Sequence, residues 1–231
     1  MSKPLSNPLK VVITGGLGAL GRSVAAVLTA RGMQIALLDR AQATEVEGVA
    51  AVFGGVDLGD VASAADAFSK AAQALGGIDA LVNVAGGFQW ETLEGGSIDT
   101  WDRLYSMNLR TAVIACKVAL PYLLQNPSGR IVNIGALASV KAAAGMGAYA
   151  ASKAGVARLT ESLAEELKDR HINVNAVLPS IIDTPANRAD MPDADVTRWV
   201  STQSLGGVIA FLLSDDASAI TGACLPVAGR V

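Results

Sequence analysis

Apolar runs too short to be helices alternate with longer helical stretches along the whole chain, and this order strongly limits the possible folds. The strand candidates are Lys10–Thr14, Gln34–Leu38, Ala50–Val56, Ala80–Val84, Arg130–Ile134, Asn173–Leu178 and Cys224–Val227. The helical patterns cover about Gly18–Arg31, Val61–Leu75, Thr100–Asn126, Ala148–Arg170 and Leu205–Ser214. Strands that are apolar throughout are buried on both faces. The alternation therefore predicts an α/β fold, with a doubly wound parallel sheet of about seven strands and helices on both faces.

The chain of 231 residues has the size of one domain, and no repeat, linker or composition shift divides it. We expect a loose tail over residues 1–9 and a single domain over residues 10–231. A net charge of −3 with scattered basic residues argues against a nucleic-acid partner. No apolar run is long enough to cross a bilayer, and the tail lacks the apolar centre of a signal peptide, so a cytoplasmic location is expected. Cys116 and Cys224 lie far apart in apolar stretches, and no metal site is expected.

A glycine-rich turn, Thr14–Gly21, follows the first apolar strand and opens the first helix. Gly15 permits a sharp turn, and Gly18 and Gly21 permit close approach of the backbone to a ligand and tight packing of the helix. The free N–H groups at the helix start, next to Leu20, would face a pyrophosphate. The turn therefore predicts a dinucleotide site.

Acidic residues after the second and third strands bear on how a dinucleotide would bind. Asp39 closes the second strand, where a carboxylate accepts the ribose hydroxyls and repels a 2′-phosphate, and this favours NAD. Arg40 follows directly and could instead pair with that phosphate, so NADP stays possible. Asp57 and Leu58, after the third strand, could contact the adenine, but Asp57 could equally be the N-cap of the following helix.

Tyr149 and Lys153 are four residues apart in the fourth helical stretch, so one turn places the phenol and the ammonium on the same face. A neighbouring cation favours the phenolate, and this would bring the pKa of the tyrosine closer to neutrality. An acid of this kind can give a proton to a carbonyl oxygen that receives a hydride, or take it back.

Taken in order, these motifs resemble the short-chain dehydrogenase/reductase family, the single-domain, Rossmann-type NAD(P)-dependent oxidoreductases. The match runs from about Lys10 to Gly229. It comprises the glycine-rich turn, Asp57, Asn83–Gly86, Asn108, Tyr149 with Lys153, Pro179–Thr184, Ile220–Gly222 and Pro226–Gly229.

The resemblance implies a role for several of these residues. Tyr149 would be the acid/base, Lys153 would bind the nicotinamide ribose and lower the pKa of Tyr149, and Asn108 would hold a water of the proton relay. Asn83, Ala85 and Gly86 would line the adenosine side and steady the sheet. Pro179, Ile182 and Thr184 lie in the segment that would hold the carboxamide. The family also implies a homotetramer, or a homodimer, through the helices around Thr111–Leu124 and Ala148–Arg170.

The chain departs from the family pattern at four places. Ala19 stands where the commonest glycine-rich turn has glycine, Val84 replaces a second asparagine, and Ser180 replaces a glycine. Ala136 lies 13 residues before the tyrosine, where the family has its catalytic serine. Ser139 lies three residues further on and is either a substitute hydroxyl or a plain loop serine.

The missing serine leaves three functions open. The leading one is hydride transfer between a nicotinamide and a small carbonyl or alcohol substrate. The segment around Pro179–Trp199 is similar to the dihydropteridine reductase-like branch, which lacks the serine, so reduction of a quinonoid is an alternative. A nucleotide-binding scaffold or sensor that has lost turnover is the third. Phe88, Gln89, Trp90 and Met146 could wall the substrate pocket, with Trp199 as its cap, or each could equally belong to core or interface packing.

Overall fold

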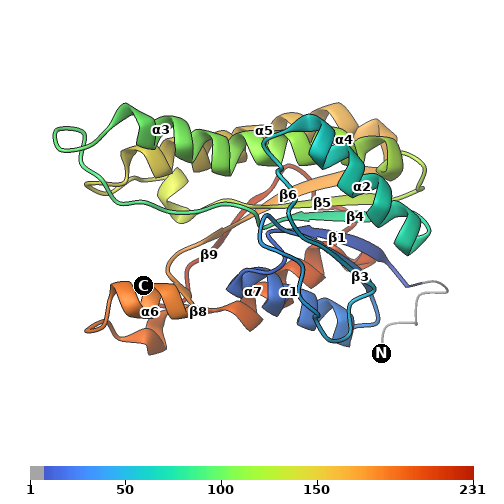
Figure 1. Ribbon diagram of the computed structural model, residues 1–231, viewed down its shortest axis with the longest axis horizontal. Coiled ribbons are helices and arrows are strands. Elements are labelled where there is room, and N and C mark those ends of the chain that lie inside the picture. Colours follow the sequence, from blue (N-terminus) through green and yellow to red (C-terminus); the bar gives the residue numbers. More distant parts are fainter. Residues whose placement is uncertain (1–7) are drawn as a thin grey trace.

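A computed structural model describes residues 8–231, and the predicted α/β fold is confirmed (Figure 1). The strands are β1 (Lys10–Thr14), β2 (Gln34–Leu38), β3 (Ala51–Phe53), β4 (Ala80–Asn83), β5 (Gly129–Ile134), β6 (Ile172–Pro179), β7 (Ile182–Asp183), β8 (Val200–Ser201) and β9 (Cys224–Val227). The α-helices are α1 (Ala19–Ala30), α2 (Val61–Leu75), α3 (Ile98–Leu104), α4 (Thr111–Leu123), α5 (Gly147–Leu167), α6 (Pro185–Asp190) and α7 (Thr202–Leu212). The predicted tail, residues 1–9, lies outside the described residues except for Pro8 and Leu9.

Seven parallel strands form the main sheet, in the order β3-β2-β1-β4-β5-β6-β9. Helices α1 and α7 pack on one face, and α2, α4 and α5 cover the other (Figure 1). The chain moves outward from β1 to β3 in one direction and then from β4 to β9 in the other. Ligands of such sheets bind outside the carboxyl ends of the strands at this switch point. The strand order therefore places a binding site beyond Thr14 and Asn83.

The carboxyl ends of the central strands are tied together by a buried chain of polar side chains. The Thr14 hydroxyl donates to the amide oxygen of Asn83 (3.3 Å), and Asn83 donates to the amide oxygen of Asn133 (2.9 Å). Asn133 in turn donates to the hydroxyl of Thr160 on α5 (2.9 Å). All four residues are buried, and a fully paired network of this kind fixes the relative positions of its members.

The helix predicted as one stretch over Thr100–Asn126 is interrupted. Between α3 and α4 the residues Tyr105–Arg110 form a turn of π-helix (η1), which contains Asn108. Such turns occur in α-helices mostly as single insertions, frequently at functional sites. The third strand is also shorter than predicted, because Gly54 and Gly55 end it after Phe53.

None of the helices in residues 8–231 is long and apolar enough to span a membrane.

Candidate active site

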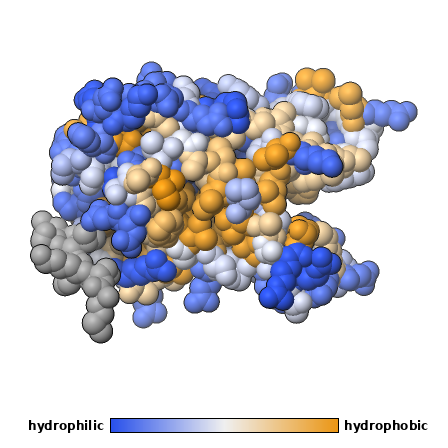
Figure 2. Space-filling view, turned by 180° about the vertical axis from the view of Figure 1, so that it is seen from behind, coloured by the Kyte–Doolittle hydropathy of each residue, from blue (hydrophilic) through white to orange (hydrophobic). Residues whose placement is uncertain are grey.

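A cavity of about 1510 Å³ opens at the carboxyl ends of the strands. Figure 2 shows it as a notch with largely apolar walls, between the layer of α3 and α5 and the segment of α6. Its lining begins at the glycine-rich turn, follows the ends of β2, β4 and β5, and reaches the loop before α6. Fifteen of the seventeen residues expected to bind the cofactor or act in catalysis border it: Gly15, Gly18, Leu20, Gly21, Asp39, Arg40, Asp57, Leu58, Ala85, Gly86, Tyr149, Lys153, Pro179, Ile182 and Thr184. Ala136, at the position of the missing serine, borders it too.

The glycine-rich turn fits a dinucleotide. Gly15 has φ +65°, and a Cβ there would lie 2.7 Å from the main-chain nitrogen of Ala85. A Cβ at Gly21 would lie 2.2 Å from the carbonyl oxygen of Gly15, so both glycines are needed for packing. A Cβ at Gly18 would meet only that carbonyl, at 3.4 Å, and Gly18 also lines the cavity, so its lack of a side chain leaves room for a ligand. Helix α1 has no acidic residue in its first turn, which leaves its positive end open to a phosphate.

Asp39 lies where the sequence places a ribose-binding carboxylate, and it also holds the turn. One carboxylate oxygen accepts from the N–H of Leu17 and the other from the N–H of Ala41, both at 2.9 Å. Each oxygen has a further lone pair for a hydroxyl donor. Arg40 is exposed beside it and lines the same part of the cavity.

Asp57 is not the N-cap of α2, because that position belongs to Asp60, which accepts from the N–H of Ser63 (2.7 Å). Asp57 instead accepts from the N–H of Gly59 (2.8 Å) and lines the cavity with the buried Leu58. The alternative of a plain helix cap for Asp57 is therefore wrong.

Asn83 and Asn108 do not border the cavity, and both make buried hydrogen bonds behind its lining. Asn83 belongs to the polar chain across the sheet. The Asn108 amide accepts from the N–H of Gly87 (2.8 Å) and donates to the carbonyl of Gly87 (3.0 Å) and to the hydroxyl of Ser152 (2.9 Å). A Cβ at Gly86 would lie 2.6 Å from the amide oxygen of Asn108, so only glycine fits there. The side chain of Asn108 thus ties the end of β4 to helix α5.

Lys153 projects from the second turn of α5 and is buried. Its ammonium donates to the carbonyl of Ile134 at the end of β5 (2.8 Å), and burial lowers its pKa to about 8. Because its remaining N–H bonds have no partner among residues 8–231, the ammonium is available to a ligand in the cavity.

Tyr149 lies one turn before Lys153 and borders the same cavity. Burial raises its pKa to about 12. This direction is opposite to the one expected from the nearby ammonium, because burial disfavours the charged phenolate. The Tyr149 ring meets the ring of Phe88 edge to face, with centroids 4.9 Å apart.

Ala136 is buried at the edge of the cavity and brings no hydroxyl to it. The hydroxyl of Ser139 donates back to the carbonyl of Ala136 (2.6 Å), and Ser139 does not line the cavity. Ser139 is therefore a loop serine here and does not replace the missing donor.

The loop before α6 lines one end of the cavity. Pro179, Ile182 and Thr184 line it, as expected. Asn187 fixes this loop, since its amide donates to the carbonyl of Ile182 (2.7 Å) and its N–H donates to the hydroxyl of Thr184 (3.2 Å). Thr184 is thereby the N-cap of α6.

The substrate walls differ partly from those expected. Phe88 and Met146 line the cavity, but Gln89 and Trp90 do not, and Trp199 is only 8% exposed and cannot act as a cap. Trp199 lies against Gly229. Sequence analysis missed the helix face of Arg103, Ser106, Met107 and Thr111, which follows spacings of three, four and eight residues from Arg103 and lines the cavity. The spacing can be read from the sequence, but the sequence alone does not show which face of this helix lies against the cavity.

Fold and site together define a class of protein. The switch point of the sheet lies beside a glycine cradle (Gly15, Gly18 and Gly21) at the start of a helix, and a tyrosine–lysine pair borders the same cavity. This combination is typical of an oxidoreductase that binds a nicotinamide dinucleotide.

Comparison with known proteins identifies the family within this class. The model of the family "short chain dehydrogenase" matches residues 9–195. A 2-(S)-hydroxypropyl-CoM dehydrogenase of Xanthobacter autotrophicus is 30% identical over 99% of this chain and 98% of its own. A short chain dehydrogenase of Burkholderia cenocepacia solved with NADP is 30% identical, with a TM-score of 0.87 over 96% of both chains. A 3-ketoacyl-(acyl-carrier-protein) reductase of Brucella melitensis solved with NADH is 26% identical, with a TM-score of 0.84 over 95% of this chain and 96% of its own. The chain belongs to the short-chain dehydrogenase family and is an NAD(P)-dependent oxidoreductase.

Proposed function

We propose that this protein reduces an apolar carbonyl compound to the alcohol, with Tyr149 as the acid and NADH as the preferred cofactor. The observation that carries the proposal is the placement of Tyr149 and Lys153 on one face of α5, both bordering the cavity that begins at the glycine cradle. A bound nicotinamide supplies the hydride, which forms the new C–H bond at the carbonyl carbon.

Tyr149 would supply the proton. As the carbonyl π bond breaks, the phenol O–H passes its proton to the carbonyl oxygen, and the phenolate is then reprotonated from water. The raised pKa of Tyr149 keeps the phenol protonated throughout the neutral range, and this is the state in which a reductase must start. Lys153 has a pKa of about 8 and is therefore largely charged at pH 7, where it favours the phenolate that forms.

The residues that would hold the dinucleotide are those of the cradle and its surroundings. Gly15, Gly18 and Gly21 would admit the pyrophosphate, and Asp39 would accept the adenosine ribose hydroxyls. Asp57, Leu58 and Ala85, which line the cavity, would border the adenosine, and Pro179, Ile182 and Thr184, which also line it, would border the nicotinamide. The carboxylate of Asp39 supports a preference for NADH over NADPH.

The walls of the substrate region support an apolar substrate. Phe88, Met107, Met146 and Met191 line it. Because Ala136 gives no hydroxyl to polarise a carbonyl, an electron-poor substrate is favoured, and a quinonoid compound is one such class.

The experiment is turnover of NADH or NADPH by the purified protein, with a panel of aliphatic ketones, aromatic ketones, quinones and a quinonoid dihydropterin. The proposal expects NADH oxidation with an apolar carbonyl compound. Tight binding of NADH without turnover of any member would refute the proposal and support a sensor or scaffold instead.

We also infer a cytoplasmic homotetramer or homodimer, assembled through α4 and α5, as the resemblance implies, with the adjoining α3 and the π-helical turn in the same layer. Large apolar side chains are exposed on this layer: Trp101 (38%), Tyr105 (51%) and Val113 (40%). Burying them against a second copy would remove this apolar surface from water. Light scattering that gives a monomer at micromolar concentration would contradict the assembly.

A further inference from the structure

The loop that follows β4 is held to the rest of the molecule at two nearby points. We call residues Phe88–Ser97 the strap. Just before it, Gly87 is fixed at both its N–H and its carbonyl by Asn108. Glu91, the fourth residue of the strap, is the second point of attachment. Only Phe88, Gln89 and Trp90 lie between these two points, so they have little conformational freedom.

Glu91 is the more elaborate of the two anchors. Its carboxylate accepts from the hydroxyl of Thr100 on α3 (2.6 Å), from the amide of Gln89 (2.8 Å) and from the N–H of Ser97. The hydrogen bond from Thr100, with further ones from Ser97 and Gln89 and the charge of Arg103, lowers the pKa of Glu91, so the carboxylate is ionised at neutral pH. A charged acceptor with three donors is a strong attachment point.

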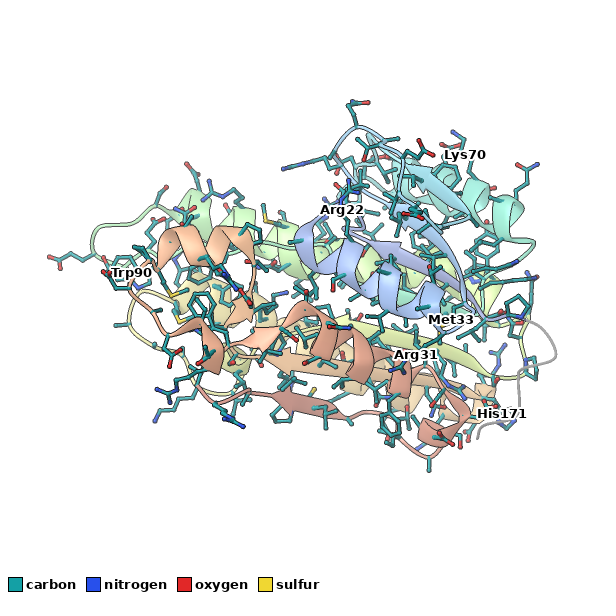
Figure 3. All side chains as sticks on the ribbon, turned by 90° about the horizontal axis from the view of Figure 1, so that it is seen from below. Arg22, Arg31, Met33, Lys70, Trp90 and His171 are labelled. Atoms are coloured by element: carbon teal, nitrogen blue, oxygen red, sulfur yellow. The ribbon has the colours of Figure 1, made fainter. Side chains whose placement is uncertain are left out.

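The strap also makes hydrogen bonds to the segment that precedes helix α5. The N–H of Glu91 donates to the carbonyl of Gly145 (2.8 Å), and the Trp90 indole N–H donates to the carbonyl of Ala144 (3.0 Å). Gly145 has φ +74°, and a Cβ there would lie within 2.1–2.6 Å of the Trp90 ring. Figure 3 shows Trp90 at the end of the molecule opposite His171. Helix α5, with Tyr149 in its first turn, begins two residues after Gly145.

Phe88 is the point at which the strap reaches Tyr149. The two rings meet edge to face at an interplanar angle of 86°, and this is a favourable aromatic geometry. The neighbouring side chains that could otherwise orient the phenol lack a hydroxyl or make their hydrogen bonds elsewhere. Ala136 has no hydroxyl, Ser139 bonds its own turn, and Lys153 bonds Ile134. Within residues 8–231 the phenol oxygen has no hydrogen-bond partner.

We propose that Phe88, held in place by the Glu91 anchor, is a positioning residue that sets the ring orientation of Tyr149 in place of a hydroxyl neighbour. Glu91 then affects turnover without touching the substrate. This inference rests on the proposed function only for its effect on turnover, because the geometry of the strap can be measured separately.

The test uses one labelled tyrosine. The chain has three tyrosines, so a Tyr105→Phe/Tyr122→Phe background with 3-fluorotyrosine carries a single ¹⁹F label, at position 149. In this background, Phe88→Leu and Glu91→Ala remove the ring contact and the anchor, and Phe88→Tyr keeps the ring. Glu94→Ala is the matched control, since Glu94 is an exposed acid of the same strap.

The proposal expects the ¹⁹F resonance to move in Phe88→Leu and Glu91→Ala and to stay in place in Phe88→Tyr and Glu94→Ala. In the unlabelled protein, kcat should fall about tenfold to a hundredfold in the first two variants, since small misplacements of a reacting group have effects of this size. The Kd for NADH should stay within about twofold, because the strap lies outside the glycine cradle.

A resonance that is unmoved in both Phe88→Leu and Glu91→Ala would overturn the proposal, whatever the turnover. A moved resonance with unchanged kcat would equally overturn it, because Tyr149 would then not depend on its orientation. A moved resonance in a protein that reduces no carbonyl compound would support the positioning and refute the proposed function instead.

Discussion

Replacing Lys153 by methionine should make the protein more stable at neutral pH while it removes activity. Lys153 is 5% exposed, and burial lowers its pKa from 10.5 to about 8. The charged form therefore costs folding free energy. A tenfold change in proton affinity is about 1.4 kcal/mol, so this pKa corresponds to about 3 kcal/mol of destabilisation well below pH 8. Methionine fills a similar volume and carries no charge.

The gain is partly offset by the hydrogen bond that is lost. Lys153→Met leaves the carbonyl of Ile134 without its ammonium donor, which costs about 1 kcal/mol. The net expectation is a stabilisation of about 2 kcal/mol at pH 7. For a chain of this length, about 1 kcal/mol moves Tm by roughly 2–4 °C, so Tm should rise by about 4–8 °C.

The pH dependence gives a second signature. Between pH 8 and 10.5 the unfolded chain binds more protons at Lys153 than the folded one does. The free energy of unfolding of the wild type should therefore rise with pH across this window. Lys153→Met should lack that part of the rise.

The assay is urea unfolding at several pH values between 7 and 10.5, with NADH binding and turnover measured in parallel. Lys70→Met is the matched control, because Lys70 is exposed and makes only an i,i+4 ion pair with Asp66. If Lys153→Met were less stable than the wild type at pH 7, or if its stability rose with pH as steeply as that of the wild type, the burial argument for this lysine would be wrong.

Four further substitutions test separate parts of the site. Ala136→Ser should raise kcat for simple ketones by about tenfold or more, since an added donor at the oxyanion is worth about 10²–10³ in favourable cases, whereas Ser139→Ala should leave steady-state rates unchanged. Asp39→Asn should shift the ratio of kcat/KM toward NADPH by about tenfold, because a carboxylate repels the 2′-phosphate; an unchanged ratio would show that Asp39 does not select the cofactor. Gly86→Ala should lower the free energy of unfolding by about 1–3 kcal/mol, because its Cβ would clash with the amide of Asn108. A Tm equal to that of the wild type would contradict this packing.

The fold could be predicted from the sequence because its signals are local. Each buried strand is a short apolar run, and the glycines of the first turn sit between a strand and a helix. The π-helical turn at Tyr105–Arg110 could not be predicted in this way. Its residues continue the helical pattern, and the insertion depends on packing of Asn108 between Gly87 and Ser152.

The structure brings most of the predicted site residues to one cavity, but the electrostatics of that cavity could not be predicted from the sequence. Tyr149 and Lys153 lie on one helix face, as a spacing of four requires. Their pKa values could not be read from spacing, because burial of both groups is a property of the folded molecule. Trp199 was expected to be exposed over the cavity, but it is buried and does not line the cavity, and its main chain lies beside Gly229, which is 30 residues further along the chain.

The most direct test of the central claim, that Tyr149 is the acid of a carbonyl reductase, is the turnover of Tyr149→Phe. This substitution removes one hydroxyl and keeps the ring that Phe88 contacts. We expect kcat with the best carbonyl substrate to fall by about 10²–10⁴, while the Kd for NADH stays unchanged. Turnover equal to that of the wild type, with NADH still bound, would show that the proton comes from another group.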